Sequence, residues 1–399
     1  MSEKIKLEDF FSSKEKIDTK KIIDDLLKNF SPKEKTVIKR RFGLDRANRQ
    51  TLEKVGQAHN LTRERIRQIE KSIIDKILLE EIKEDLAQLR ELVILLLEEH
   101  GGVAEKGHLF RVLDKVSDLS LNLKDEDKKS KIKENHFDFL LSRIFSQDLE
   151  EIKREDRFKD AFKLKSHSLD HIEELSRELT REIKKLKNVL ETKELLEMIT
   201  NLESFKKHEE KLKNPARIRL NHLFEEEMHP EEKKVLEDYR GLYSVLQVIR
   251  EIERNKFGHW GHVSWNEISP KTVNDKIYLI LKNYNKPLHF TEIADLINQT
   301  NFDHKTTNPA TVHNELILDD KYVLIGRGMY GLKEWGLKEG TVVQVIKDIL
   351  ASSSQALSRE EIINKVLENR LVKESTINLA LSNRKEFQRV GDKYVLAEK

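Results

Sequence analysis

Apolar residues recur every three or four positions along most of this chain, which is the spacing of helices that bury one face. In the N-terminal part the clearest stripe consists of Ile66, Ile69, Ile73 and Ile77. Thr62 stands before this stripe as a suitable N-cap, and Asn60 favours the left-handed backbone of a tight turn. A shorter amphipathic helix is expected to begin near Thr51. The pattern predicts a short helix, a three-residue turn and a longer helix, which together form a helix-turn-helix.

A further helix is predicted upstream, within the stretch SPKEKTVIKRRFG. Ser31 can cap this helix, Pro32 suits its first position, and Glu34 can complete a capping box. Gly43 follows the last apolar residue and favours termination of the helix. Residues 1–80 are therefore expected to fold as one small helical domain.

Two C-terminal segments, 271–337 and 338–399, repeat the same order of patterns. Each shows three helices, then a strand, a glycine-containing turn and a second strand. The turn glycines are Gly326, Gly328 and Gly331 in the first segment and Gly391 in the second. Three helices followed by a two-stranded wing predict a winged helix in each segment.

Two stretches upstream fit this pattern less regularly. Residues 89–165 again indicate three helices and a wing, with the polar stretch 120–135 expected to be a loose loop. Residues 170–270 hold long helical patterns followed by a wing-like segment at 256–269. For residues 170–215 a helical spacer with charged faces is the open alternative.

The expected fold class is therefore mainly α with small β wings, arranged as a helix-turn-helix domain followed by tandem winged helices. The expected domains are 1–80 (helix-turn-helix), 81–168 (winged helix), 169–270 (a helical segment with a fourth winged-helix pattern), 271–337 (winged helix) and 338–399 (winged helix).

The composition excludes several chemistries. The chain has no cysteine, which excludes disulfides, thiolate catalysis and cysteine-ligated zinc or iron–sulfur sites. His259 and His262 lack a third ligand at a recognisable spacing, so no metal and no cofactor are expected. No residue set indicates an enzyme. The longest apolar run, 92–97, is far short of the ~20 residues of a membrane span, and the start lacks the apolar core of a signal peptide. A cytoplasmic, nucleoid-associated protein without membrane contact is expected.

Charge is unevenly placed along the chain. The net charge is +2, but residues 1–80 carry 20 Lys and Arg residues against 14 Asp and Glu residues, a balance of +6 that leaves −4 for the remainder. A surface for nucleic acid is therefore expected near the N-terminus.

The second helix of the helix-turn-helix carries one polar face, formed by Arg63, Glu64, Arg67, Gln68 and Lys71. The N-terminal part of this helix enters the major groove in such motifs, where arginine reads guanine, glutamine reads adenine and glutamate accepts from cytosine. Arg65 lies to the side of this face. Phosphate contact is expected from Arg65, Thr62 and the basic run Lys39, Arg40 and Arg41.

The stretches KEKTVIKRRFGLD and TLEKVGQAHNLTRERIRQIEKSIIDKI resemble region 4 of the σ70-type sigma factors of bacterial RNA polymerase. The resemblance covers about residues 20–80. It implies recognition of the promoter −35 element and docking on the polymerase β-flap. It also implies base contacts by Arg63, Glu64, Arg67 and Gln68. Backbone contacts are implied for Thr51, Leu52, Thr62 and Arg65, and Lys71 is counted with this backbone set.

Two further features bear on this resemblance. Regions 2 and 3 precede region 4 in the sigma family, whereas only about 30 residues stand before it here, so the chain alone is not expected to open a promoter. The stretches KPLHFTEIADLI (286–297) and DDKYVLIGRGMYGLKEWG (319–336) resemble the HARE-type helix-turn-helix of the polymerase δ subunit. That second resemblance implies association with DNA or polymerase.

The function that these features favour is a DNA-binding transcription factor that acts with bacterial RNA polymerase. The expected partners are double-stranded promoter DNA and the β-flap of the polymerase core, with a separate sigma factor left open as a third. The alternative is a polymerase accessory subunit or scaffold whose helix-turn-helix modules bind only protein. The negative balance beyond residue 80 favours protein binding by the later modules.

Overall fold

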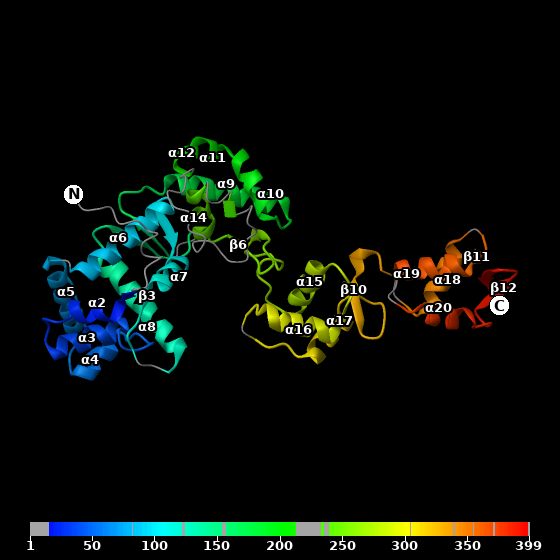
Figure 1. Cartoon of the computed structure of the whole chain (residues 1–399), viewed down its shortest axis with the longest axis horizontal. Helices are drawn as coiled ribbons and strands as arrows, with labels where there is room; N and C mark the ends of the chain where they lie inside the picture. Colours follow the sequence, from blue (N-terminus) through cyan, green and yellow to red (C-terminus); the bar gives the residue numbers. More distant parts are fainter. Residues whose placement is uncertain are drawn as a thin grey trace. The chain divides into compact units, whose positions relative to one another are not determined.

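The computed structural model describes residues 16–81, 83–121, 124–153, 157–212, 233–234, 239–303, 305–337, 340–353, 355–369 and 372–397. Their contacts divide the chain into two compact units (Figure 1). The first extends to Arg254 and includes Gly258–Val263, and the second comprises Asn255–Phe257 and the chain from Ser264 onward. Each unit is a separate body with its own cores.

The first unit begins with a helix-turn-helix domain. Its helices are α2 (Thr19–Leu26), α3 (Pro32–Phe42), α4 (Leu52–His59) and α5 (Arg63–Leu79). Ser31 and Glu34 form the predicted capping box at the start of α3, and Gly43 ends this helix with a left-handed φ of 69°. Asn60 ends α4 in the same conformation, with a φ of 54°. The local signals at the helix ends are therefore confirmed.

A module of three helices and a three-stranded sheet follows. Its elements are α6 (Glu84–Glu99), β2 (Val103–Glu105), α7 (Lys106–Val116), α8 (Glu126–Phe139), the π-helix η1 (Leu140–Ile144), β4 (Leu149–Ile152) and β5 (Ala161–Leu164). The sheet is antiparallel in the order β2-β5-β4, so the last strand is central. The short strands β1 (Ile17–Asp18) and β3 (Ser117–Asp118) pair in parallel and join this module to the helix-turn-helix domain.

The prediction of a loose loop at 120–135 is wrong, because α8 begins at Glu126. Asp125 caps this helix by accepting a hydrogen bond from the Lys128 amide. Lys133 is buried, and its Nζ donates to the carbonyl oxygens of Asp114 (3.1 Å) and Ser117 (2.7 Å). The stretch resembles a loop in sequence because hydrogen bonds compensate its buried polar groups, which leaves a weak hydrophobic pattern.

The last part of the first unit contains α9 (Asp170–Leu186), α10 (Thr192–Asn201), α11 (Glu203–Lys207), α12 (Glu209–Leu212), α14 (Arg240–Val248), β6 (Ile252–Arg254) and β7 (Trp260–His262). β6 and β7 pair antiparallel, and Leu190 forms an isolated bridge with Trp260 on the other side of β7. β7, the last of these segments in the chain, thus lies between Leu190 and β6, as the last strand does in the preceding module. Pro230 with Glu232, a pair that suits the start of a helix, lies outside the described residues.

The second unit contains two modules with the same connectivity. The first has α15 (Val273–Tyr284), β8 (Leu288–His289), α16 (Phe290–Thr300), α17 (Pro309–Leu318), β9 (Tyr322–Leu324), β10 (Met329–Leu332) and the short 3-10 helix η3 (Lys333–Trp335). The second has α18 (Val342–Ser352), β11 (Leu357–Ser358), α19 (Arg359–Asn369), α20 (Glu374–Leu381), β12 (Phe387–Val390) and β13 (Lys393–Leu396). Their sheets run β8-β10-β9 and β11-β13-β12.

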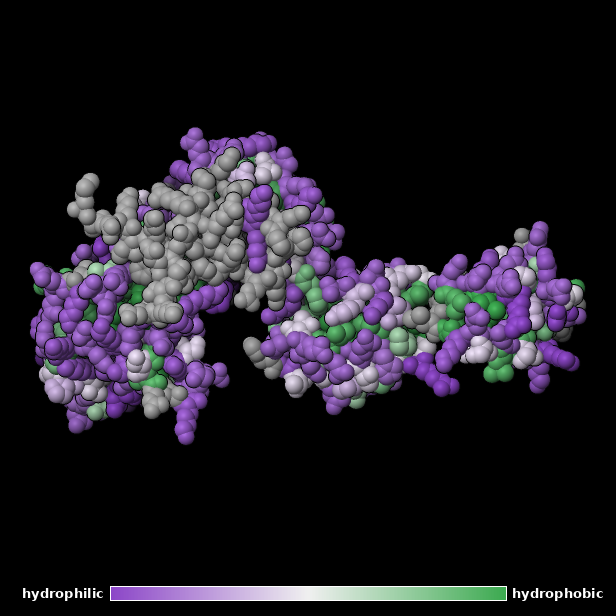
Figure 2. Space-filling view, viewed as in Figure 1, coloured by the Kyte–Doolittle hydropathy of each residue, from purple (hydrophilic) through white to green (hydrophobic). Residues whose placement is uncertain are grey.

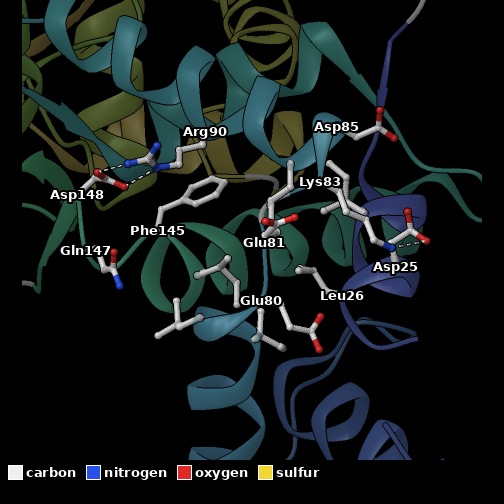
Figure 3. Close-up of a pocket in the computed structure, with 15 residues that line it drawn as sticks. Asp25, Leu26, Glu80, Glu81, Lys83, Asp85, Arg90, Phe145, Gln147 and Asp148 are labelled. Carbon is white, nitrogen blue, oxygen red and sulfur yellow. Dashed lines mark hydrogen bonds and ion pairs between the residues drawn. The ribbon is translucent and has the colours of Figure 1, made fainter. Parts of the chain in front are cut away.

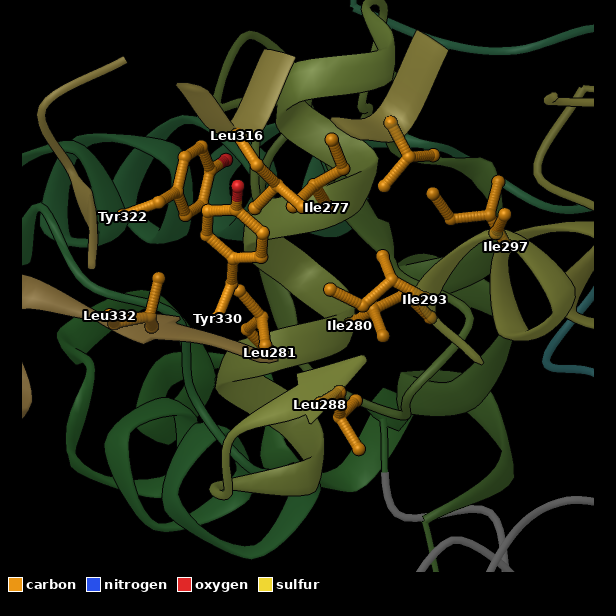
Figure 4. Packing of buried hydrophobic residues seen from close by; sticks show 12 residues of the cluster. Ile277, Ile280, Leu281, Leu288, Ile293, Ile297, Leu316, Tyr322, Tyr330 and Leu332 are labelled. Atoms are coloured by element: carbon orange, nitrogen blue, oxygen red, sulfur yellow. The ribbon is translucent and has the colours of Figure 1, made fainter. Parts of the chain in front are cut away.

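The core of the first of these modules shows how the helices and the sheet pack. Ile277 and Ile280 of α15 lie between the side chains of α16 on one side and those of the strands on the other (Figure 4). Trp335 packs against this cluster from its edge. Burial of these apolar side chains is the main term that holds each small module together.

The fold class, mainly α with small antiparallel sheets and an N-terminal helix-turn-helix, is confirmed. The connectivity α-β-α-α-β-β with the last strand central recurs in three modules, as tandem winged helices would require. The domain limits drawn from the sequence stay predictions. On the face shown in Figure 2, hydrophilic residues cover most of the described surface. Within the described ranges, no helix is long and apolar enough to cross a membrane.

Candidate nucleic-acid interface

A small apolar core fixes the angle between α4 and α5. Val37 of α3, Val55 of α4 and Ile66 of α5 are fully buried against one another, and Leu52, Leu61 and Ile69 cover them partly. Ile66, Ile73 and Ile77 of the predicted stripe are buried, whereas Ile69 is half-buried. The stripe therefore anchors α5 and turns its opposite side to solvent.

The turn between the two helices depends on a close approach at Gly56. The amide of Leu61 donates to the Gly56 carbonyl oxygen at 2.9 Å. A Cβ atom at position 56 would lie 2.5 Å from the Leu61 carbonyl oxygen, which is shorter than a van der Waals contact. The glycine is thus required for the tight turn that presents α5.

The residues predicted to contact bases lie together on the exposed side of α5. Arg63, Glu64, Arg67 and Gln68 are exposed, as are Lys71 and Arg65. None of them contributes to the buried core. The structure therefore brings together on one accessible helix face the side chains that can read base edges.

These side chains are already paired within the helix. Arg67 donates two hydrogen bonds to the Glu64 carboxylate, at 2.8 and 2.7 Å, and Arg65 donates to the Gln68 side-chain oxygen at 3.1 Å. The hydrogen bond from Arg67 lowers the pKa of the Glu64 carboxyl and raises the pKa of the Arg67 guanidinium. Contact with a base pair must therefore share or replace these bonds.

Two of the predicted phosphate-contacting cations are held inside the fold. Lys39 pairs with Asp24 at 2.9 Å. Arg41 pairs with Glu70 at 3.0 Å and donates to the Gln50 carbonyl oxygen at 3.1 Å. Arg40 has its Nε buried without a hydrogen-bond partner among the described residues. The roles of these three residues at phosphate stay predictions, and contact by Lys39 or Arg41 must compete with an ion pair.

The threonines of the predicted backbone set cap the two helices. The Thr51 hydroxyl accepts from the Lys54 amide at 3.2 Å, and the Thr62 hydroxyl accepts from the Arg65 amide at 3.1 Å. Leu52 is half-buried, so its backbone amide is the group that it can offer. The first amides of a helix lack internal acceptors and attract anions, so both helix starts suit phosphate oxygens.

The contacts that hold the helix-turn-helix domain leave only a weak signal in the sequence. The loop after α3 docks on α8 through Arg49, which donates to Asn135 (2.7 Å) and to Asp138 (2.5 Å). The Asn135 amide in turn donates to the backbone oxygens of Gly43 (3.1 Å), Arg46 (3.3 Å) and Ala47 (3.1 Å). The following module therefore holds the main chain of this loop by hydrogen bonds from a side chain of α8.

Two further contacts complete this docking. His136 is fully buried, with Nδ1 3.0 Å from the Thr19 hydroxyl and Nε2 2.8 Å from the Leu44 carbonyl oxygen. Burial opposes the charged form of Asp138, yet its pKa is lowered, because Lys106 and Arg49 stabilise the carboxylate. The one signal of this docking in the sequence is that polar residues stand between Ile132, Phe137 and Phe139. A helix that buries polar as well as apolar side chains must contact polar groups of another segment.

A pocket of about 140 Å³ opens where α2, the end of α5, α6 and η1 meet (Figure 3). Its apolar lining consists of Ile22, Leu26, Ile77, Leu78, Leu86, Ile144 and Phe145. Lys83 pairs with Asp25 at 3.4 Å, and Arg90 holds Asp148 through two bonds of 2.7 and 2.5 Å. Glu80 and Glu81 stand at the rim without an ion-pair partner in the described part of the chain. The pocket thus combines an apolar floor with an acidic rim.

A helix-turn-helix that exposes arginine, glutamate and glutamine on its second helix belongs to the class of DNA-binding modules. Comparison with known proteins agrees with this class. Residues 26–77 match the family Sigma-70, region 4. The chain therefore carries a sigma-70 region 4 domain, which occupies a small part of its 399 residues.

Curated relatives match short stretches of the chain. The RNA polymerase principal sigma factor HrdD of Streptomyces coelicolor is 51% identical over 49 residues, which are 12% of this chain and 15% of that protein. The RNA polymerase sigma factor SigA of Nostoc sp. is 47% identical over 60 residues, 15% of this chain and 14% of the relative. The match thus spans about a seventh of the relatives' own length.

Proposed function

We propose that this protein is a DNA-binding transcription factor that acts with bacterial RNA polymerase and reads a −35-type promoter element with α5. The observation that carries the proposal is the exposed face of α5, where Arg63, Glu64, Arg67 and Gln68 lie together on a rigid helix. Arginine and glutamine suit the edges of guanine and adenine in the major groove. Thr51, Leu52, Thr62, Arg65 and Lys71 are proposed to fix the register on the backbone, with Lys39, Arg40 and Arg41 beside them.

Polymerase binding is proposed for the pocket beneath α5. Its apolar floor suits an apolar segment, and the unpaired carboxylates of Glu80 and Glu81 suit cations beside that segment. We propose that this pocket receives the polymerase β-flap. The double substitution Glu80→Lys with Glu81→Lys should reduce recovery of core polymerase on the immobilised chain, whereas Glu126→Lys on α8 should not. Equal recovery by both variants would argue against this docking site.

The DNA-reading proposal is tested by fluorescence anisotropy with the full chain and a duplex that carries a −35-type element. Arg67→Ala should cost about 1–3 kcal/mol of discrimination at one base position. Lys76→Ala removes the same charge from another side of α5, so it should leave discrimination unchanged. If Arg67→Ala binds all duplexes as the unaltered chain does, base reading by α5 is wrong.

A second function, contact with protein, is proposed for the C-terminal modules. Their third helices, α17 and α20, contain neither lysine nor arginine. These helices expose Ile317, Leu318 and Leu379 instead, at 62, 80 and 74% of the full residue surface. The resemblance of residues 271–337 to the HARE-type module fits a polymerase-associated role of this kind. Binding without catalysis is the activity proposed for the chain as a whole.

A further inference from the structure

A cluster of cations on α9 lies outside everything assigned so far. Arg177, Arg181 and Lys184 follow one another at i, i+4 and i+7 and are exposed on one helix face. They line an open depression of about 330 Å³ together with Arg157, Ser176, Thr180 and Glu251. The three positions on α9 span about 10 Å along the helix axis.

The fourth cation is brought to the depression by backbone contacts. The Arg250 amide donates to the Arg157 carbonyl oxygen at 2.9 Å, and the Lys159 amide donates to the Val248 carbonyl oxygen at 2.9 Å. Phe158 between them is buried and bridges to Ile249. Arg157 is thereby anchored beside α9, so the cluster is assembled from two separate parts of the chain.

Two hydroxyl groups form the floor of this depression. Ser176 and Thr180 are 3 and 5% exposed, and the Thr180 hydroxyl has no hydrogen-bond partner among the described residues. A buried hydroxyl without a hydrogen-bond partner is unfavourable. Such a group favours a ligand that brings acceptor oxygens to the floor.

The side chains that line the depression carry four cations and one carboxylate. Glu251 is the one carboxylate in the lining, and it is held by Lys184 at 2.7 Å and faced by His262 at 3.4 Å. Glu178 accepts from the Ser204 amide at 2.8 Å and lies 3.9 Å from the Arg181 guanidinium. Arg177 also pairs with Glu173, and Arg181 pairs with Glu182, at the surface, where ion pairs contribute little stability. A stronger acceptor can therefore recruit both guanidinium groups.

We propose that this depression, lined by Arg157, Arg177, Arg181 and Lys184 over a floor of hydroxyls, binds phosphate groups of the DNA backbone. Guanidinium groups match phosphate oxygens in pairs. The three cations on α9 span a greater length than the 3.4 Å between charges on one DNA strand. They can therefore contact more than one phosphate of the same strand. The choice of DNA as the source of phosphate rests on the proposed function.

The test is the salt dependence of duplex binding by the full chain. Each phosphate contact adds about 0.9 to the slope of log K against log salt. Arg177→Gln with Arg181→Gln should lower this slope by about 1 to 2 and weaken binding to every duplex alike. The control, Arg111→Gln with Lys193→Gln, removes two exposed cations of the same unit elsewhere and should leave the slope near that of the unaltered chain.

The outcomes separate this site from base reading by α5. An equal slope for the Arg177/Arg181 variant and the unaltered chain, or an equal fall in the control, would overturn the proposal. Saturable binding of inorganic phosphate at this site without a change of the DNA slope would also overturn it. A lowered slope supports the site even if Arg67→Ala shows no loss of base discrimination, because that loss tests the proposed function alone.

Discussion

At the scale of single residues, the pairing of Glu64 with Arg67 bears on the DNA contact proposed for α5. The two side chains hold each other in one geometry before any ligand arrives, with two hydrogen bonds between them. Because both are exposed, the pair contributes little stability. The pairing fixes the direction of the Arg67 donors and places the Glu64 carboxylate next to them. We expect this arrangement to favour a base pair that offers a matching acceptor and donor, and to disfavour contact with phosphate.

Glu64→Gln tests this effect. The substitution removes a negative charge from the groove-facing side, so affinity for duplexes of any sequence should rise roughly a few-fold. Discrimination at the base position that Glu64 contacts should fall by about 1–3 kcal/mol. Anisotropy titrations with a set of single-base variants of the duplex measure both effects. A gain in affinity with unchanged discrimination would exclude Glu64 from base reading.

His136 is a buried residue in the docking of the helix-turn-helix domain. Burial lowers the pKa of its imidazole below the ordinary value of 6.5. The unfolded chain therefore takes up a proton more readily than the folded chain. The stability that His136 contributes is complete above pH 6.5 and is lost as the pH falls below that value.

His136→Ala should lower the protection of α2 and α8 amides in hydrogen exchange by about 2–4 kcal/mol at pH 7.5, because Thr19 and Leu44 lose their partner. The difference between variant and unaltered chain should shrink at pH 5.5. Comparing the two chains removes the parallel effects of His108 and His171, whose pKa values are also lowered. A difference that stays constant with pH would contradict the assignment.

At the scale of elements, the helix-turn-helix depends on the contact between α4 and the turn. Gly56→Ala places a methyl group against the Leu61 carbonyl oxygen, so α4 or the turn must shift. We expect a loss of about 1–3 kcal/mol in the protection of α4 and α5 amides. Glu53 in the same helix is exposed, so Glu53→Ala should change the protection of these amides by less than about 0.5 kcal/mol. Equal effects of the two substitutions would show that the turn tolerates a side chain.

The sequence predicted these elements because their signals are local. Ser31, Gly43 and Thr62 take the predicted cap positions. Asn60 has the predicted left-handed conformation, and α4 begins directly after Thr51, as expected. The face of α5 followed from helical spacing alone. What DNA or protein it contacts was a matter of resemblance, and it stays a proposal.

The elements that could not be predicted depend on distant partners. β8 and β11 are two residues long, too short for an alternating pattern, and they form only because β10 and β13 offer free edges. α8 is stabilised by carbonyl groups of residues about 90 positions earlier in the chain. Neither kind of contact leaves a periodic signal in the residues themselves.

At the scale of the whole molecule, modules with the same connectivity expose different side chains on their third helices. The third helix of the module that follows the helix-turn-helix domain, α8, is covered by that domain, whereas α17 and α20 expose apolar side chains. α17 and α20 contain neither lysine nor arginine, whereas α5 exposes several cations on the face predicted to read DNA. Sequence-specific contact with DNA is therefore expected from the N-terminal domain only.

Added negative charge distinguishes these surfaces. Gln68→Glu on α5 should weaken duplex binding by the full chain about tenfold, because the carboxylate faces the DNA. Asn314→Glu on α17 and Thr376→Glu on α20 place the same charge on exposed positions of the other two helices and should change affinity less than about twofold. A tenfold loss from either of these two would show that the C-terminal modules bind DNA as well.

The most direct test of the central claim, that α5 reads base sequence, is selection of duplexes from a random pool by the full chain and by its Arg67→Ala variant. The account predicts that the unaltered chain enriches one short motif. It also predicts that the variant enriches the same motif with one position relaxed. No enrichment by the unaltered chain, or an identical motif from both proteins, would contradict the claim.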